Sequence, residues 1–121
     1  MMEISTMIID TETFLVFKGV EYLQIPVSQI VSIQVEAQKY LIIETTLGNY
    51  RVLTSLASIA KYLTNFIKVS KGLIINRYYL IKLVKCVHNK DNYYLVMSNG
   101  EKECYITEIS AYIARNVIAQ L

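Results

Sequence analysis

Short apolar runs separated by turn residues fill the first half of the chain. The run over Thr13–Lys18 ends at Gly19, and the next leads to Pro26, which belongs at a strand end or sheet edge because proline has no N–H to donate. Later runs are rich in β-branched residues, and Gly48-Asn49 is a turn pair typical of a hairpin. The pattern therefore predicts further strands over residues 30–35, 40–46 and 50–52.

The period of the apolar positions changes once, after this hairpin. Leu56, Ile59 and Leu63 recur at helical spacing, and Ser55 precedes them at a position where its side chain can cap the first turn. The spacing predicts a short amphipathic helix that ends near Asn65.

Extended segments return after this helix. Gly72 allows a tight bend between two of them, and Asn99-Gly100 is a second tight hairpin turn. The apolar positions around these turns predict strands over residues 66–69, 73–75, 79–87, 93–97 and 103–106.

The last predicted element is a helix. Thr107 can cap its start, and Ile109, Ile113 and Val117 then lie on one face. The chain contains no linker, low-complexity tract or internal repeat, so we expect one domain over residues 1–121. The expected fold class is mainly β, with one short internal helix and a C-terminal helix.

Composition agrees with a folded domain outside the membrane. The chain has 121 residues, of which 54% are hydrophobic, and its ten tyrosines favour β structure. No apolar run approaches the roughly 20 residues that a membrane helix needs, and the first residues lack the basic and apolar regions of a signal peptide. We therefore expect an intracellular, cytoplasmic protein that does not contact a membrane.

Few residues offer chemistry of their own. Cys86 and Cys104 form neither a CxxC pair nor a metal-ligand spacing, so we interpret them as small apolar strand residues. His88 is the single histidine and has no nucleophile or carboxylate at a suggestive spacing, which predicts a surface residue. The sequence also lacks paired carboxylates, a nucleophile motif and a phosphate-binding glycine loop. We expect a protein that is not an enzyme and has no cofactor or metal site.

Charge is distributed unevenly along the chain. Between residues 45 and 90 there are eight basic residues and no acidic one, while the rest of the chain holds four basic and ten acidic residues, a net charge of −6. Such a segment indicates a phosphate-rich partner if folding gathers it into one patch, and nothing in particular if the residues scatter. The eight basic residues are Arg51, Lys61, Lys68, Lys71, Arg77, Lys82, Lys85 and Lys90.

Four segments of the chain follow one known sequence pattern in order and spacing. Residues 66–77 begin with an aromatic-led strand, continue through polar and basic residues and an apolar run, and reach Asn76. Residues 30–40, with Ala37 and Tyr40 in place, precede them, as do a hairpin and helix over 45–63, and a closing hairpin over 93–107 follows. Together they resemble the LytTR family of bacterial DNA-binding domains, with a similarity that covers residues 14–118.

The resemblance implies a fold of β-strands that binds duplex DNA through loops rather than through a recognition helix. Members of the family contact two successive major grooves and the minor groove between them, and they read short direct repeats, often as two copies on the DNA. Most are output domains of response regulators. Because the chain has no room for a receiver domain, we expect a stand-alone copy or an excised C-terminal half that acts as a sequence-specific transcription regulator.

The resemblance also assigns regions of DNA contact. The first contains Gln38 and Lys39, and Lys39 can reach a phosphate or a guanine edge. In the second, Lys71 takes the main base-contacting position. Lys68 and Ser70 flank it and can donate to phosphates.

Two further positions complete the expected site. Asn76 matches the family's asparagine, and we expect it to satisfy turn backbone in the left-handed conformation that Asn tolerates, with Arg77 beside it as a phosphate contact. The third region contains Thr107, which keeps a hydroxyl, and Glu108, whose negative charge opposes DNA. Alternatively, Thr107 and Glu108 only cap and begin the last helix.

Two functional hypotheses follow from this pattern. The first is a regulator whose partner is double-stranded DNA, on which two copies can form a homodimer. The second is a protein-interaction module on the same fold, with DNA binding weakened or lost because of Glu108. In that case the partner is another protein.

Overall fold

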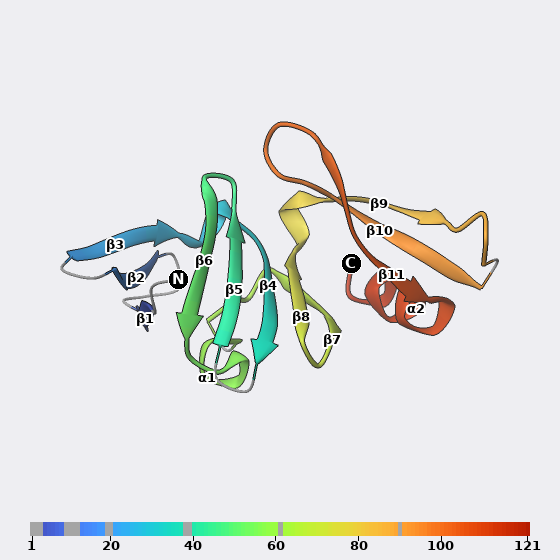
Figure 1. The fold of residues 1–121 in the computed structure, drawn as a ribbon. Coiled ribbons are helices and arrows are strands. Elements are labelled where there is room, and N and C mark those ends of the chain that lie inside the picture. The colour runs from blue at the N-terminus through green and yellow to red at the C-terminus, as the bar shows by residue number, and fades with distance from the viewer. Residues whose placement is uncertain (1–3, 9–12, 19–20, 38–39, 61, 90) are drawn as a thin grey trace.

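The computed structural model describes residues 4–8, 13–18, 21–37, 40–60, 62–89 and 91–121, and within them the chain is mostly β-strand (Figure 1). The two helices of this part are α1 (Leu56–Ala60) and α2 (Ala111–Ala119), and single 3-10 turns cover Val27–Gln29 and Arg77–Tyr79. The strands are β1 (Ile4–Ile8), β2 (Thr13–Lys18), β3 (Glu21–Pro26), β4 (Ile30–Ala37), β5 (Tyr40–Thr45), β6 (Gly48–Leu53), β7 (Phe66–Ser70), β8 (Leu73–Asn76), β9 (Leu80–Lys85), β10 (Asn92–Ser98) and β11 (Glu103–Ser110). The predicted fold class is confirmed.

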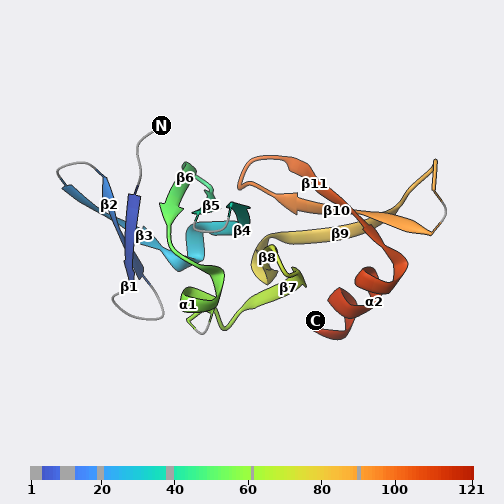
Figure 2. The same ribbon diagram turned by 60° about the horizontal axis from the view of Figure 1, so that its bottom comes forward.

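The strands form two sheets that lie side by side (Figures 1 and 2). The larger has eight strands in the order β3-β2-β1-β6-β5-β4-β8-β7, and the smaller has three in the order β11-β10-β9. Neighbouring strands are antiparallel except β1 and β6, which run parallel. Strand β7 is therefore an edge of the large sheet, and α2 lies beside it.

Two apolar cores lie on the two sides of the β7–β8 hairpin. One gathers buried residues of β4, β5, β6 and α1, and the other lies between the hairpin, the small sheet and α2. Strand β8 contributes to both, because Ile74 packs into the first and Ile75 into the second, as the alternation of side chains along a strand requires. This hairpin is thus fixed from both faces.

The first hairpin turn lies two residues earlier than the sequence indicates. Thr45 pairs with Gly48, so the turn consists of Thr46 and Leu47 rather than Gly48-Asn49. The Thr45 hydroxyl closes it, accepting from the N–H of Leu47 at 3.1 Å and donating to the Gly48 carbonyl at 2.6 Å. Gly48 still has a positive φ of 142°, which explains a glycine here although it is not a central turn residue.

The internal helix is shorter than predicted. Ser55 caps it as expected, since its hydroxyl accepts from the N–H of Ser58 at 3.3 Å. The helix ends at Ala60, and the chain continues to Phe66 through turns in which Leu63 and Phe66 donate to carbonyls three residues back. The end near Asn65 was wrong because apolar spacing does not distinguish a helix from such a series of turns.

The start of the last helix was also wrong. Strand β11 stays paired with β10 as far as Ser110, which lies opposite Asn92. Ser110 is the residue that caps α2, accepting from the N–H of Ile113 at 3.2 Å. Thr107 and Glu108 therefore lie in a strand, and the alternative that they serve only as a helix start is excluded.

Candidate nucleic-acid interface

The turn between β7 and β8 places Lys71 at the exposed tip of a short hairpin. Ser70 pairs with Leu73, so Lys71 and Gly72 form the turn. The Gly72 carbonyl accepts from the N–H of Val35 on β4 at 2.7 Å, which attaches the turn to the next strand of the sheet. The bend was predicted, but Gly72 has no positive φ, so the turn does not depend on the conformational freedom of glycine.

Ser70 is held in this turn by its own side chain. Its hydroxyl oxygen accepts from the N–H of Gly72 at 3.3 Å, which leaves the hydroxyl hydrogen to donate outward. The side chain is exposed. Ser70 and Lys71 thus present one neutral and one charged donor at the hairpin tip.

The end of β4 and the start of β5 lie at the same end of the sheet as this tip (Figure 1). Gln34 pairs with Leu73, and β4 then continues to Ala37, which pairs with Tyr40 on β5. Gln38 and Lys39, the first predicted contact region, lie between these strand ends and outside the described residues.

A shallow groove of about 310 Å³ joins the hairpin tip to the third predicted region. Ser70 and Gly72 line one side, and Thr107 and Glu108 of β11 line the other. The structure therefore brings together two regions that are 37 residues apart in the chain. Glu108 is exposed and its carboxylate accepts from the Nδ2 of Asn92 at 2.6 Å, so a negative charge lies beside this groove.

A second groove, of about 330 Å³, lies on the α1 side of the hairpin. Lys68 and Lys71 line it together. Its other lining residues are apolar except for one glutamine: Leu56, Ala57, Ala60, Leu63, Phe66, Ile74 and Gln120. The two lysines are thus adjacent on one face of the hairpin.

Arg77 lies at the other end of the hairpin from the tip. Its N–H donates to the Asn65 carbonyl at 3.1 Å, and its guanidinium donates to the backbone carbonyl of Gln120. The side chain is exposed. Arg77 is therefore oriented by the C-terminal end of α2 and is not part of the Ser70–Lys71 turn.

Folding does not gather the acid-free segment into one patch. Arg51 is paired with Glu36 at 2.9 Å and stacks over Tyr40 at 3.8 Å, and Lys82 lies 3.5 Å from Glu103. Lys85 is exposed on the small sheet, while Lys61 and Lys90 lie outside the described residues. Lys68, Lys71 and Arg77 remain as a row along the β7–β8 hairpin.

Asn76 has a structural role, but by another geometry than predicted. Its φ of −79° and ψ of 120° are extended, not left-handed. The side chain is 3% exposed, its Nδ2 donates to the Ile30 carbonyl at 2.8 Å, and its Oδ1 accepts from the N–H of Tyr78 at 3.0 Å. Asn76 thus joins β4 to the turn that leads into the small sheet.

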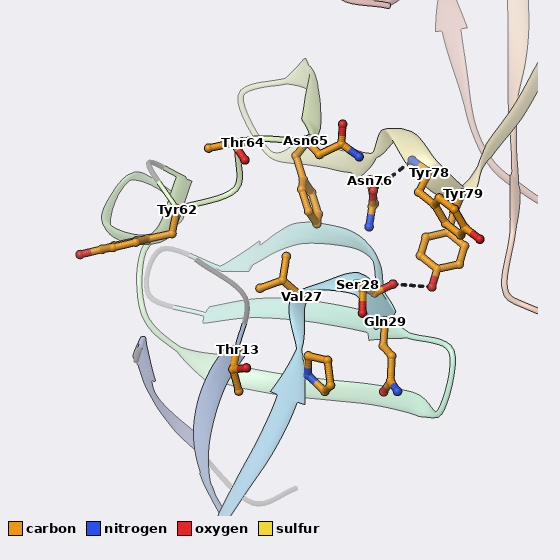
Figure 3. Close-up of a pocket in the computed structure, with 12 residues that line it drawn as sticks. Thr13, Val27, Ser28, Gln29, Tyr62, Thr64, Asn65, Asn76, Tyr78 and Tyr79 are labelled. Atoms are coloured by element: carbon orange, nitrogen blue, oxygen red, sulfur yellow. Dashed lines mark hydrogen bonds between the residues drawn. The ribbon is translucent and has the colours of Figure 1, made fainter. Parts of the chain in front are cut away.

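A wide hollow of about 730 Å³ opens beside Asn76, at the end of the hairpin away from Lys71 (Figure 3). Its lining residues are uncharged. One of its polar groups already has a partner in the protein, because the Tyr79 hydroxyl donates to the Ser28 carbonyl at 2.5 Å. Burial, and secondarily the neighbouring Tyr78, raises the pKa of Tyr79 above its usual value of 10.0. The hydroxyl therefore stays protonated and keeps this bond at neutral pH.

The two cysteines are free and lie at opposite ends of β10. The Cys86 N–H donates to Asn92, whereas Cys104 pairs with Met97, about 16 Å further along at the rise of a strand. That separation excludes a disulfide. Burial, with a smaller contribution from the Glu108 carboxylate, raises the pKa of the Cys86 thiol, so this side chain stays protonated at neutral pH.

Two features of the described residues bear on other functions. No cluster of three His, Cys, Asp or Glu side chains is placed to hold a metal ion there. Neither of the helices in this part of the chain has the length and apolar character to cross a membrane.

Sequence reasoning missed Asn92 and Gln120, which contact Glu108 and Lys68 respectively. Neither residue belongs to a motif, and each acts on a partner far away in the chain. Only the fold could reveal them.

The fold agrees with what comparisons with other proteins show. The sequence profile of the LytTr DNA-binding domain matches residues 21–113. A solved structure from Bacillus cereus, described as the LytTr DNA-binding domain of a methyl-accepting/DNA response regulator, is similar with a TM-score of 0.68 and 15% identity, over 90% of this chain and 95% of that one. No curated protein matches the chain. Because the family profile covers most of its residues, the chain belongs to the LytTr DNA-binding domain family.

Proposed function

We propose that this domain is a sequence-specific transcription regulator that inserts the Ser70–Lys71 turn into duplex DNA. The observation that carries the proposal is an exposed lysine at the tip of a hairpin that is packed on both faces and bonded to β4 through Gly72. A rigid tip loses little conformational freedom on binding, so the interaction of its charge with DNA is retained as affinity.

The proposed contacts differ in kind. Lys71 donates to guanine O6 and N7 in a major groove, although its ammonium lacks the fixed fork of arginine. Lys68, Ser70 and Thr107 donate to phosphates and set the position of the domain on the duplex. Gln38 and Lys39, which follow β4 in the sequence, contact a further stretch of DNA. Two copies would read a direct repeat as a homodimer, with half-sites about one helical turn apart.

Binding of labelled duplex to the wild-type domain should depend steeply on salt. With about four basic side chains close to phosphates, affinity should fall roughly 100-fold between about 50 and 200 mM salt, because each of these charges releases condensed counterions. Fluorescence anisotropy with a repeat-containing and a random duplex measures both affinity and preference. An affinity that stays flat across this range, or no binding to either duplex at low salt, rejects the proposal.

The carboxylate of Glu108 supports a second candidate, a protein-interaction module. This charge lies beside the groove that Ser70 and Thr107 line, where a phosphate would be repelled. A basic protein surface would instead be attracted to it. Removing the charge should strengthen DNA binding under the first candidate and weaken binding of a basic protein under the second.

Glu108→Gln should raise DNA affinity about 2- to 5-fold at low salt, with a smaller gain at high salt, because one repulsive charge is removed. Glutamine keeps an oxygen that can accept from Asn92, so the local structure is preserved. Anisotropy titrations of both proteins test this. An unchanged affinity for DNA would mean that Glu108 does not face the duplex, and a basic protein partner lost by the variant would support the second candidate.

A further inference from the structure

Strand β7 is an edge strand, yet its central residue is bonded on the outer side. The N–H of Lys68 donates to the Oε1 of Gln120 at 3.0 Å, and the Lys68 carbonyl accepts from the Nε2 of Gln120 at 2.9 Å. The side-chain amide thus pairs with both backbone groups, as a neighbouring strand would. The same Nε2 also donates to the Asn116 carbonyl at 3.1 Å, which fixes the amide on the last turn of α2.

The backbone of Gln120 makes a second contact with the hairpin. Its carbonyl accepts from the guanidinium of Arg77, at the negative end of the α2 dipole. One residue at the end of α2 therefore holds Lys68 on β7 and Arg77 after β8, and Figure 2 shows this end of α2 beside β7. We call these contacts the Gln120 clamp.

The clamp lies at the margin of an apolar contact. Val117 and Ala114 of α2 are buried in the same core as Ile67 and Val69 of β7. That core packs against the inner face of the hairpin. The side chains of Lys68 and Arg77 are exposed and do not belong to it. The family profile ends at residue 113, so family membership assigns no role to Gln120.

We infer that Gln120 is a positioning residue for DNA binding, which fixes the backbone beneath Lys68 and the guanidinium of Arg77 so that both face the phosphates. This role rests on the proposed function. An edge strand without the clamp would have a free N–H and carbonyl and would open more often. Lys68 and Arg77 would then be mobile in the free protein. Their ordering would take place on binding, and its entropic cost would lower the affinity for DNA.

Gln120→Ala removes the amide that bonds Lys68 but keeps the backbone carbonyl that bonds Arg77, so it tests the Lys68 contacts of the clamp. Asn116→Ala is the matched control on the same exposed face of α2, because Gln120 bonds the backbone carbonyl of Asn116, which this variant keeps. Without DNA, amide exchange measured by NMR should show faster exchange of the Lys68 N–H in Gln120→Ala only. With DNA, Gln120→Ala should bind about 3- to 10-fold more weakly, with a smaller salt dependence, while Asn116→Ala binds as wild type does.

A double-mutant cycle separates positioning from general destabilisation. In a Lys68→Ala background, Gln120→Ala should lose most of its effect on affinity, because the side chain that it positions is absent. Unchanged Lys68 exchange in Gln120→Ala overturns the clamp, and fully independent effects in the cycle overturn the positioning role. If wild type binds no DNA, the proposed function and the positioning role both fail, while the exchange result still shows whether the clamp exists.

Discussion

Replacing Lys71 by glutamate should lower the affinity of this domain for duplex DNA by about 30- to 100-fold at roughly 0.1 M salt. The change removes a donor at the hairpin tip and adds a negative charge at the point of closest approach. The hairpin itself should not be disturbed, because Lys71 is exposed and neither the Ser70–Gly72 bond nor the Val35–Gly72 bond involves its side chain. Anisotropy with wild type and variant measures the loss directly.

Lys102→Glu is the matched control for this charge reversal. Lys102 is also exposed in a hairpin turn, but that turn joins β10 to β11 and lies beside the β5–β6 turn, at the opposite end of the large-sheet strands from the Lys71 tip (Figure 1). Its effect should be small and should vanish at moderate salt, since distant charges are screened. Equal losses in the two variants would mean that net charge alone governs binding, and the Lys71 tip would no longer be the contact.

The strand pattern was predictable because the described strands keep a period of two where one face is buried. Strand β5 is the clearest case, with Leu41, Ile43 and Thr45 buried and their neighbours half-buried. Strand β1 was not predicted, and among the described residues it pairs with β2 and, 48 positions further along the chain, with β6. The start of α2 was misplaced because a hydroxyl residue before an apolar period occurs at both Thr107 and Ser110, and only pairing with β10 selects the second.

The candidate site was predictable only in part. The tip position of Lys71 follows from a short turn between two strands, which is a local property. Arg51 and Lys82 form ion pairs with Glu36 and Glu103, and these pairs depend on which residues of neighbouring strands lie opposite one another. A count of charges along the sequence does not give that register. For the same reason the sequence did not show that Arg77 is directed to the end of α2.

The hairpin that carries this site depends on one buried polar side chain. Asn76 is at the end of β8, where the chain leaves the large sheet for the small one. Its amide donates to the Ile30 carbonyl on β4 and accepts from the N–H of Tyr78, so it joins β4 to the connection between the two sheets. Few other residues could supply both a donor and an acceptor at this distance.

Asn76→Ala should lower the free energy of unfolding by about 2–4 kcal/mol, because a buried carbonyl and a turn N–H both lose their partner and a small cavity is left. Chemical denaturation of the variant and wild type gives the difference. Asn65→Ala is the control, since Asn65 is exposed and its bond to Arg77 uses only the backbone, so its loss should stay below about 0.5 kcal/mol. A loss below about 1 kcal/mol for Asn76→Ala would show that water replaces both bonds. The connection between the sheets would then be held by apolar packing, and the orientation of the β7–β8 hairpin would not depend on this amide.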